Sequence, residues 1–331
     1  MQESPAEAEE AAAAPSRFIW IALALAAAGV GALAALAVIS PGGGGRPQIE
    51  LPIPPPPVAV GATPDPALVE QAADGPLPIV ASDGRQAWQV YARPFVPTDA
   101  RPRVAVVISG LGLDAETTRA AVERLPPAVS LGFSPYARDL PNWIAAARKA
   151  GHEVLLGLPM EPTDYPRQDP GPATLLSALE PAQNRARLRW TMSRGTDYVG
   201  LVAIMGGRFA ANRPNLEPVL DELKKRGLMF LDNHAADASV AGELGRDLGM
   251  AWAVADRRLD GEATAAAIDQ SLTDLETVAV KEGSALGLGT VNPLTVEHVV
   301  AWVPTLEKKG LAFAPATGIA GRQHLQAKPA Q

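Results

Sequence analysis

Asp232 and His234 are the residues of this sequence best placed to move protons. They follow a short apolar run, 228–231, in a chain with only four histidines, at positions 152, 234, 298 and 324. A carboxylate beside an imidazole can act as an acid–base pair or bind a metal ion. If the apolar run is a strand, both residues lie at its carboxyl end, where parallel α/β folds place their active sites. A polar loop in which Asp232 caps the backbone is the other interpretation, and the pattern leaves both open.

Ser109 and Gly110 occupy the corresponding position after an earlier apolar run, Val104-Ala-Val-Val-Ile108. This uncharged, β-branched run predicts a buried strand. The segment 110–115, Gly-Leu-Gly-Leu-Asp-Ala, also matches a dinucleotide-binding turn with alanine in the third glycine position. However, the end of the next predicted strand, 131–134, offers no acid for a ribose, and Asp114 would face the pyrophosphate. The dinucleotide interpretation is therefore disfavoured.

Composition excludes several other kinds of site. The 331 residues carry a formal net charge of -7, which argues against a general nucleic-acid binder, because such proteins present a basic surface to the phosphates. The sequence has no cysteine, so disulfides and thiolate metal sites are excluded. The sequence also lacks a His-Glu-x-x-His motif, a Gly-x-Ser-x-Gly motif and a phosphate-binding loop.

Alternating strands and helices are predicted from 103 to 320. Several predicted helices end in a basic residue with glycine one or two positions later, as at 149–151, 225–227 and 308–310, and an apolar run begins within three residues of each glycine. Basic side chains suit the negative end of a helix, and glycine accepts the left-handed cap. The alternation predicts a parallel sheet with helices outside it, and seven or eight strands favour a distorted (β/α) barrel of about seven strands. Predicted strands are 104–108, 129–133, 153–158, 198–204, 228–231, 251–254, 285–288 and 311–314; predicted helices are 114–124, 140–150, 181–194, 215–226, 237–248, 263–280 and 295–309, the last capped by Thr295.

The first 102 residues differ in composition from the rest. Residues 1–17 form an acidic tail, and 18–39 carry no charge over about 22 residues, enough for a single transmembrane helix at about 1.5 Å per residue. A buried core helix and a cleaved signal peptide are the alternatives, and the acidic head and the length disfavour the latter. Residues 40–102 form a Pro/Gly-rich linker, in which 86–92 could be a short strand or packing arm. A C-terminal tail covers 321–331. Arg17 and Arg46 flank the apolar segment, so charge does not determine its orientation.

The motifs between 103 and 320 occur in one order that resembles the divergent polysaccharide deacetylases of bacterial envelopes. The resemblance rests on Val104-Ala-Val-Val-Ile-x-x-Leu-Gly112, Gly151-His-Glu-Val-Leu-Leu-x-Leu-Pro-Met-Glu-Pro162, Pro170-Gly-Pro172, Met205-Gly-x-Arg-Phe209, Arg226-Gly-Leu-x-Phe-Leu-Asp232 and 285–295. It implies a distorted (β/α) barrel and a water molecule, activated by a divalent metal, that attacks an acetamide carbonyl. Together with the apolar segment 18–39, it implies a single-pass protein of the bacterial inner membrane whose barrel faces the periplasm.

This sequence departs from the family pattern at the metal-binding positions. The pattern expects two aspartates where Ser109 and Gly110 stand, histidines where Gly157 and Ile204 stand, and Gly-His-Pro where the chain has Gly289-Thr-Val291. Three acidic or basic positions of the pattern are kept, namely Glu161, Arg208 and Asp232. The residues that replace the ligands cannot form a hard-metal site, so no metal site and no cofactor are expected. The predicted pocket consists of Ser109, Gly110, Glu161, Arg208, Asp232 and His234.

Three functions remain open. The first is a membrane-anchored pseudoenzyme of the cell envelope that binds a glycan or a partner protein in the former catalytic cleft. The second is a working glycan N-deacetylase with a site rebuilt around Asp232 and His234, with Glu161 as a further candidate. The third is a spacer or scaffold protein, in which the proline-rich stalk and the membrane segment are the functional parts.

Overall fold

The computed structural model describes residues 64–96 and 99–323. The predicted acidic tail, the predicted transmembrane segment 18–39, the linker up to residue 63 and the C-terminal residues 324–331 lie outside the described residues. Within the described ranges, no helix combines the length and apolar character needed to cross a membrane.

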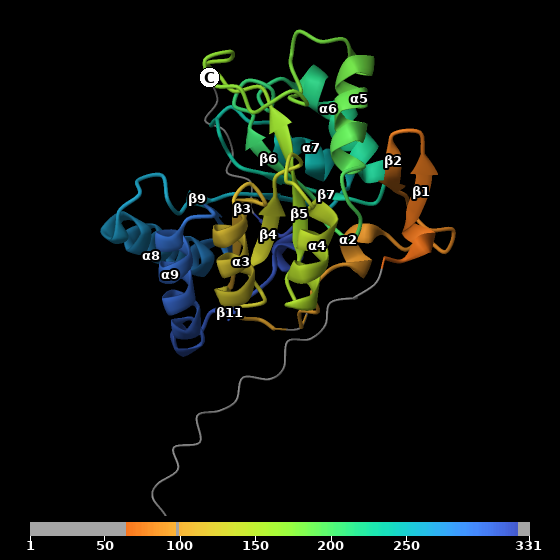
Figure 1. The fold of residues 1–331 in the computed structure, drawn as a ribbon. Helices are drawn as coiled ribbons and strands as arrows, with labels where there is room; N and C mark the ends of the chain where they lie inside the picture. Colours follow the sequence, from red (N-terminus) through yellow and green to blue (C-terminus); the bar gives the residue numbers. More distant parts are fainter. Residues whose placement is uncertain (1–63, 97–98, 324–331) are drawn as a thin grey trace, which may run out of the picture. The chain divides into compact units, whose positions relative to one another are not determined.

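The described residues form a mostly parallel α/β unit (Figure 1). Its strands are β1 (Val69–Ala72), β2 (Gly75–Pro78), β3 (Arg103–Leu111), β4 (Ser130–Phe133), β5 (Val154–Met160), β6 (Gly200–Met205), β7 (Met229–Asp232), β8 (Trp252–Val254), β9 (Arg257–Arg258), β10 (Ser284–Thr290) and β11 (Ala312–Phe313). Its α-helices are α2 (Ala87–Val90), α3 (Ala115–Arg124), α4 (Leu140–Lys149), α5 (Pro181–Met192), α6 (Arg213–Lys225), α7 (Ala241–Leu248), α8 (Ala265–Glu282) and α9 (Pro293–Trp302). Short 3-10 turns occur at Pro66–Leu68, Val303–Thr305, Glu307–Lys309 and Ala316–Ile319.

The main sheet is parallel and runs in the order β8-β7-β6-β5-β4-β3-β10-β9, with β11 added beside β3. One segment supplies both ends of this path, because β8 and β9 are separated by only Ala255 and Asp256. Its first half pairs with β7 and its second half with β10, and the Asp256 amide donates to the Leu286 carbonyl. The sheet therefore curls round on itself, which confirms the predicted parallel α/β sheet.

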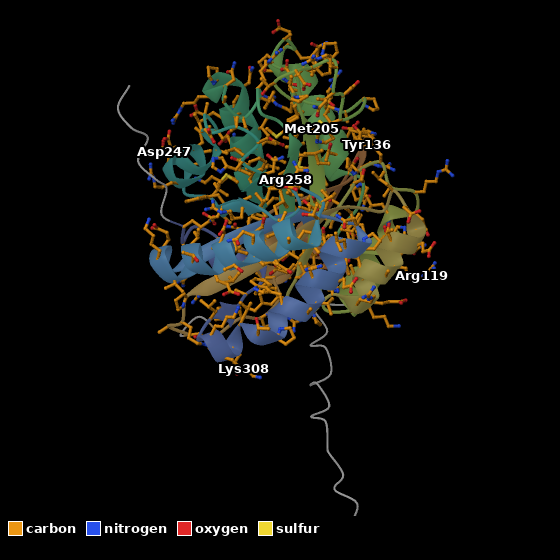
Figure 2. The ribbon with its side chains drawn as sticks, turned by 90° about the vertical axis from the view of Figure 1, so that its left-hand side faces the viewer. Arg119, Tyr136, Met205, Asp247, Arg258 and Lys308 are labelled. Atoms are coloured by element: carbon orange, nitrogen blue, oxygen red, sulfur yellow. The ribbon has the colours of Figure 1, made fainter. Side chains whose placement is uncertain are left out.

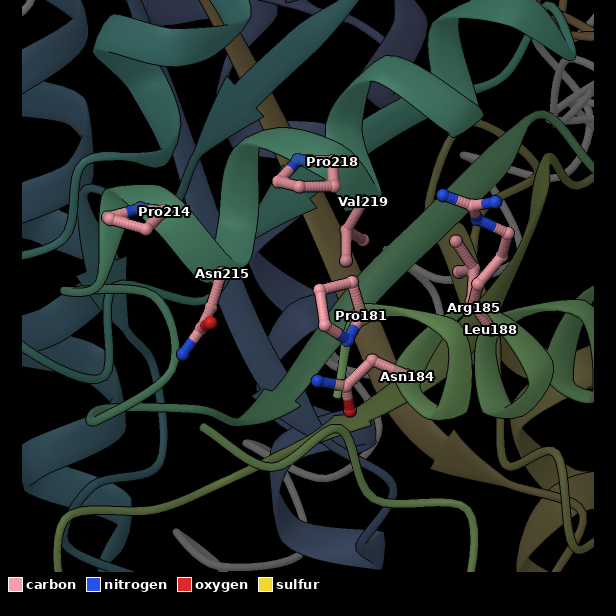
Figure 3. Close-up of a pocket in the computed structure, with 8 residues that line it drawn as sticks. All are labelled: Pro181, Asn184, Arg185, Leu188, Pro214, Asn215, Pro218 and Val219. Carbon is pink, nitrogen blue, oxygen red and sulfur yellow. The ribbon is translucent and has the colours of Figure 1, made fainter. Parts of the chain in front are cut away.

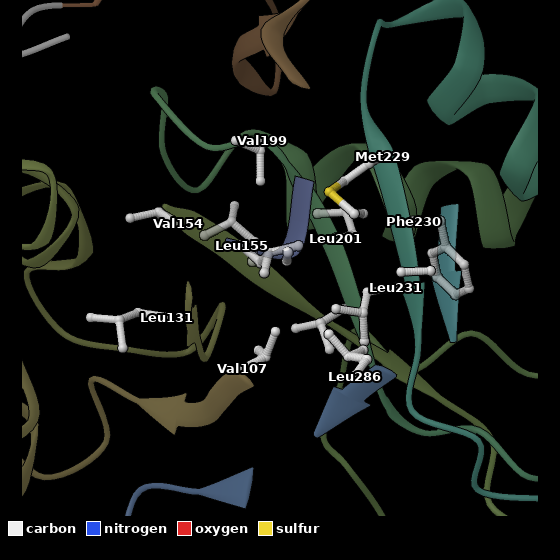
Figure 4. Close-up of a cluster of buried hydrophobic side chains, with 14 of the residues drawn as sticks. Val107, Leu131, Val154, Leu155, Val199, Leu201, Met229, Phe230, Leu231 and Leu286 are labelled. Carbon is white, nitrogen blue, oxygen red and sulfur yellow. The ribbon is translucent and has the colours of Figure 1, made fainter. Parts of the chain in front are cut away.

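The core lies between the strands and the surrounding helices (Figure 4). Strand β5 is buried at every position and β3 at its first six, so both strands have apolar neighbours on both faces. Helix α8 packs against β10, and α4 packs against β4 and β5 (Figure 1). The uncharged runs in the sequence thus mark the interior of the curled sheet.

Helix ends follow the capping residues in the sequence. The Asp114 carboxylate accepts a hydrogen bond from the Thr117 amide and begins α3, as predicted. The prediction that Thr295 caps the last helix is wrong, because Asn292 does so by accepting from the Thr295 amide. That helix ends at Trp302, and 3-10 turns continue the chain to Lys309.

The prediction of a spacer over residues 40–102 is wrong for residues 64–96, which pack onto the sheet unit. Leu77 and Tyr91 are almost fully buried in the common core. Arg226, at the end of α6, forms ion pairs with Glu70 and with Glu222 and donates to the Pro78 carbonyl. The predicted strand or packing arm at 86–92 is the short helix α2. High proline content therefore conceals a folded hairpin whose apolar side chains are covered by the rest of the unit.

Candidate functional site

A cavity of about 910 Å³ opens at the carboxyl ends of the parallel strands. Strands β3, β6, β9 and β10 contribute residues directly, and loops after β4, β5 and β7 complete the wall. This is the end of an α/β barrel at which active sites are built. The lining residues that matter for the chemistry are Ser109, Gly110, Tyr136, Ile204, Met205, Asn233, His234, Asp256, Arg257, Arg258, Asp260 and Thr290.

Asp232 and His234 are neighbours, but they do not form an acid–base pair. The Asp232 side chain is buried behind the cavity wall, where its two oxygens accept hydrogen bonds from the His234 amide at 3.2 Å and the Ser239 hydroxyl at 2.6 Å. The His234 ring points elsewhere, with Nδ1 3.3 Å from the Ala255 carbonyl oxygen. Burial raises the pKa of Asp232, and the bonds from Ser239 and His234 only partly oppose it. Asp232 therefore holds the loop, as in the capping interpretation.

Residues with strained, left-handed backbone conformations lie at or just after the ends of β6 and β7. Met205 and His234 both adopt left-handed conformations, with φ of 59° and 52°, and both line the cavity. The Asn233 side chain ties the two turns together by donating to the Met205 carbonyl at 2.9 Å. Such conformations are costly for residues other than glycine and gather at functional sites. The turns thus favour a site at this end of the sheet.

Ser109 and Gly110 line the cavity, as the sequence predicts. The Ser109 hydroxyl donates to the Gly289 carbonyl at 3.2 Å, so it is used within the protein. Gly110 has a φ of 85° and lies in an irregularity of the β3–β4 register. These two residues supply one hydroxyl and no carboxylate where the family pattern has two acids.

Gly157 and Ile204 replace the two expected histidines on adjacent paired strands, β5 and β6. A Cβ atom at Gly157 would lie 3.0 Å from Cγ1 of Ile204 and closer still to its Cδ1. The Ile204 side chain therefore fills the space that a side chain at 157 would need, and it faces the cavity with an apolar surface.

Thr290 stands at the expected position of the late histidine and is bound to a carboxylate that the sequence did not single out. Its amide and its hydroxyl donate to Oδ2 of Asp260 at 2.6 and 2.5 Å. Asn292 and Thr295 donate to the same oxygen at 3.3 and 3.2 Å. Asp260 is thus fixed in the wall of the cavity by the loop that follows β10.

Glu161 and Arg208, predicted as pocket residues, do not line the cavity and instead join two loops beside it. Glu161 accepts hydrogen bonds from the Ser177 amide at 2.6 Å and from Nη1 of Arg208 at 3.0 Å. Nη2 of Arg208 donates to the Thr163 carbonyl at 2.6 Å. Burial alone would raise the pKa of Glu161, but the bonds from Ser177 and Arg208 outweigh it and lower the pKa. The pair holds the loop after β5 against the turn after β6.

The residues of this cavity do not fit the divalent metal that the family pattern implies. Within residues 64–96 and 99–323, no three histidine or acidic side chains lie close enough together to hold a metal ion. The oxygens of Asp232 and Glu161 are occupied by protein donors, and the replacements at 157 and 204 offer no ligand atom. The arrangement does not support the hypothesis of a metal site rebuilt around Asp232, His234 and Glu161.

Sequence reasoning missed the charged and aromatic parts of the cavity. Arg257 and Arg258 line one side of it, and the labels in Figure 2 place Arg258 on the face that also carries Met205 and Tyr136. Tyr136 accepts a hydrogen bond from the Ala173 amide at 3.0 Å, and its ring centre lies 5.5 Å from that of Trp190. The two adjacent arginines after the short apolar run 251–254 were the sequence feature that could have indicated this part of the site. Their place in the cavity follows only from the fold, in which that segment joins both edges of the sheet.

A much smaller cavity, of about 20 Å³, lies between α5 and α6 (Figure 3). It has room for about one water molecule. Its polar side chains serve the neighbouring loop, since Asn184 hydrogen-bonds to both backbone groups of Leu176 and Asn215 donates to the Ser177 carbonyl. Ser177 in turn donates to Glu161, so the residues around this small cavity help to hold the loop beside the larger one.

Comparison with known proteins identifies the family by sequence and finds a solved structure with the same fold. The model of the divergent polysaccharide deacetylase family matches residues 106–320. A solved structure of an uncharacterised protein from Agrobacterium tumefaciens C58 is 37% identical, with a TM-score of 0.72, and the match covers 74% of this chain and 99% of that one. An uncharacterised protein of Haemophilus influenzae is 25% identical over 210 residues, 62% of this chain and 73% of its own. The uncharacterised protein YibQ of Escherichia coli is 25% identical over 197 residues, 59% and 60% of the two chains.

Proposed function

This chain belongs to the divergent polysaccharide deacetylase family, and we propose that it acts in the cell envelope by binding a saccharide, without the metal-dependent deacetylation of that family. One observation carries the proposal. The cavity at the catalytic end of the sheet is large and open, while Ser109, Gly110, Gly157, Ile204 and Gly289 stand at the positions of the expected metal ligands or beside them.

The chemistry of the wall supports a polar, ring-shaped ligand. Tyr136 supplies an aromatic surface, and Asn233 and Thr290 supply hydrogen-bonding groups around it. Specific small-molecule sites combine an apolar wall with a few placed polar groups. A volume of about 910 Å³ falls within the range of about 300–1,000 Å³ common for such sites.

The location of the protein is part of the same proposal. The uncharged segment 18–39 would anchor the chain in the inner membrane, and the family's association with envelope glycans would place the sheet unit in the periplasm. An activity reporter fused to the C-terminus tests this placement. A reporter that works only outside the cytoplasm supports it, and one that works only inside contradicts it.

Binding to the cavity is tested with the purified full-length protein. The probes are soluble peptidoglycan fragments and acetylated chito-oligosaccharides, measured by calorimetry in the presence of a chelator. Ala235→Trp adds a bulky side chain to the cavity wall at an exposed position, and Val280→Trp is the matched control on the exposed face of α8. We expect wild type and Val280→Trp to bind at least one probe and Ala235→Trp to bind neither. Failure of the wild type to bind either probe, or equal binding by Ala235→Trp, contradicts the proposal.

A spacer role explains less of the structure than saccharide binding does. A protein that acted through its stalk would not require two strained turns and a buried carboxylate network around an open cavity. If Ala235→Trp replaced the wild type in cells without any change in the phenotype of a deletion strain, the spacer role would be favoured.

A further inference from the structure

Arg258 differs from the adjacent Arg257 in that its guanidinium group at the edge of the cavity has terminal nitrogens that no other described residue occupies. Its side chain is 69% exposed, and its Nε lies 3.8 Å from Oδ1 of Asp260. Neither of its terminal nitrogens hydrogen-bonds to any other residue within the described ranges. Arg257, by contrast, donates from Nη1 to the Asp256 carbonyl at 2.9 Å and faces Asp274 on α8. Arg258 is therefore the arginine that is free to receive a ligand.

The partner of Arg258 is a carboxylate that cannot easily move. The side chain of Asp260 is only 1% exposed, and four donors from residues 290–295 converge on its Oδ2. Its other oxygen, Oδ1, is buried and has no hydrogen-bond partner among the described residues. The only cation beside that oxygen in the described structure is Arg258. The fixed negative charge of Asp260 thus faces the Nε edge of Arg258.

An arginine whose Nε faces a fixed carboxylate at ion-pair distance offers its two terminal nitrogens on its other side. This planar pair of donors matches the two oxygens of a carboxylate or phosphate group. A ligand in the cavity that carried such a group next to β9 would receive two charge-assisted hydrogen bonds. A neutral ligand would leave the guanidinium facing water.

The other carboxylates of the cavity do not compete strongly for this arginine. Asp256 accepts hydrogen bonds from the Leu286 amide at 2.8 Å and from Gln323 at 2.6 Å, which fix it within the wall. Asp164, in the loop after β5, lies 3.8 Å from Arg167 and accepts from Gln168.

We propose that the cavity selects saccharides that carry an anionic substituent, and that Arg258, positioned by Asp260, binds that substituent. The inference rests on the proposed saccharide-binding function and names the class of ligand for the same cavity. The recognised chemistry is a carboxylate or phosphate on a sugar ring. Arg258 makes the contact, and Asp260 is a positioning residue that never touches the ligand.

Matched pairs of probes distinguish recognition of the anionic substituent from recognition of the sugar ring. The carboxylate arm compares the disaccharide of N-acetylglucosamine and N-acetylmuramic acid with neutral di-N-acetylchitobiose. The phosphate arm compares N-acetylglucosamine 6-phosphate with N-acetylglucosamine. Dissociation constants are measured for the full-length wild type, Arg258→Gln, Arg258→Lys and the control Arg119→Gln, an exposed arginine on α3 that does not line the cavity.

We expect the wild type and Arg119→Gln to bind one anionic probe about tenfold or more tighter than its neutral partner, since hydrogen bonds to charged groups are the stronger ones. Arg258→Gln removes the preference and leaves neutral binding within about twofold. Arg258→Lys restores only part of it, because a lysine ammonium lacks the planar pair of N–H donors that a guanidinium offers. The arm that shows the preference identifies carboxylate or phosphate. Equal binding of neutral and anionic probes by the wild type overturns this inference but leaves saccharide binding intact, whereas absence of binding to all four probes overturns both.

The variant Asp260→Asn distinguishes two roles of Asp260, namely positioning Arg258 and adding negative charge to the cavity. Removing a negative charge makes the cavity more positive, so a purely electrostatic role predicts tighter binding of the anionic probe. Positioning predicts the opposite, about tenfold weaker anionic binding with neutral binding unchanged. Tighter anionic binding by Asp260→Asn overturns the positioning role. A thermal unfolding scan of the same sample shows that the variant is folded, and the unchanged neutral affinity is a readout that a general loss of structure would not give.

Discussion

The Ile204 side chain occupies the space directly above Gly157, so that a Cβ atom at residue 157 would lie 3.0 Å from Cγ1 of Ile204. These residues stand on adjacent parallel strands at two positions where the family pattern has histidines. The two positions are therefore coupled in packing. A residue without a side chain and a larger apolar residue together fill this space.

This coupling predicts a non-additive result for substitutions at the two positions. Gly157→Ala should destabilise the wild type by roughly 1–3 kcal/mol, because a methyl group enters a filled space. The same substitution in an Ile204→Ala background should cost little, which gives a coupling energy of about 1 kcal/mol or more. Denaturant unfolding of the two single variants and the double variant measures it. Additive effects would show that Ile204 does not fill this space.

Asp232 makes a prediction about pH. Burial raises its pKa above the ordinary value of 3.8, so the folded state holds the proton more tightly than the unfolded state does. The stability that this carboxyl contributes is fully present below pH 3.8 and is lost as pH rises through the higher folded-state pKa. Asp232→Asn keeps the side-chain size without titrating.

The free energy of unfolding of Asp232→Asn should therefore rise relative to that of the wild type as the pH increases from 4 to 8. Urea unfolding at several pH values measures the difference. A difference that is constant with pH, or that moves in favour of the wild type, would mean that the pKa of Asp232 is not raised in the folded protein.

The hairpin β1–β2 predicts that the folded unit begins well before residue 103. Leu77 is fully buried, whereas Val96 is 64% exposed. Leu77→Ala should lower the free energy of unfolding by roughly 2–5 kcal/mol, as for other buried leucines. Val96→Ala, the control in the same proline-rich region, should change it by less than about 0.5 kcal/mol. If Leu77→Ala is as mild as the control, the segment is a spacer after all.

The sequence predicts the strands and helices of the sheet unit well where local signals are strong. The uncharged run that forms β3 and the cap at Asp114 act through neighbouring residues, so they can be recognised without the fold. The roles of Arg258 and Asp260 depend on a segment that pairs with β7 and then with β10, strands that are far apart along the sheet. The hairpin at 69–78 was missed because its prolines suggest an extended chain, while its stability comes from contacts with α6 and the core.

The residues at the family's metal positions support the proposal of ligand binding without a catalytic metal. Ser109 is hydrogen-bonded to Gly289, Asp232 to Ser239, and the Gly157–Ile204 pair is closed by packing. Each of these positions is thus either empty of donor atoms or engaged within the protein. A metal bound here would need at least three free ligands to be held firmly.

Equilibrium dialysis of the full-length protein against Zn²⁺, followed by measurement of the bound metal, shows whether the cavity holds a metal ion. We expect well below one zinc per chain, with no difference between the wild type and the variants Asp232→Ala and His234→Ala. One zinc per wild-type chain that is lost in Asp232→Ala or His234→Ala would contradict this expectation and would establish a rebuilt metal site.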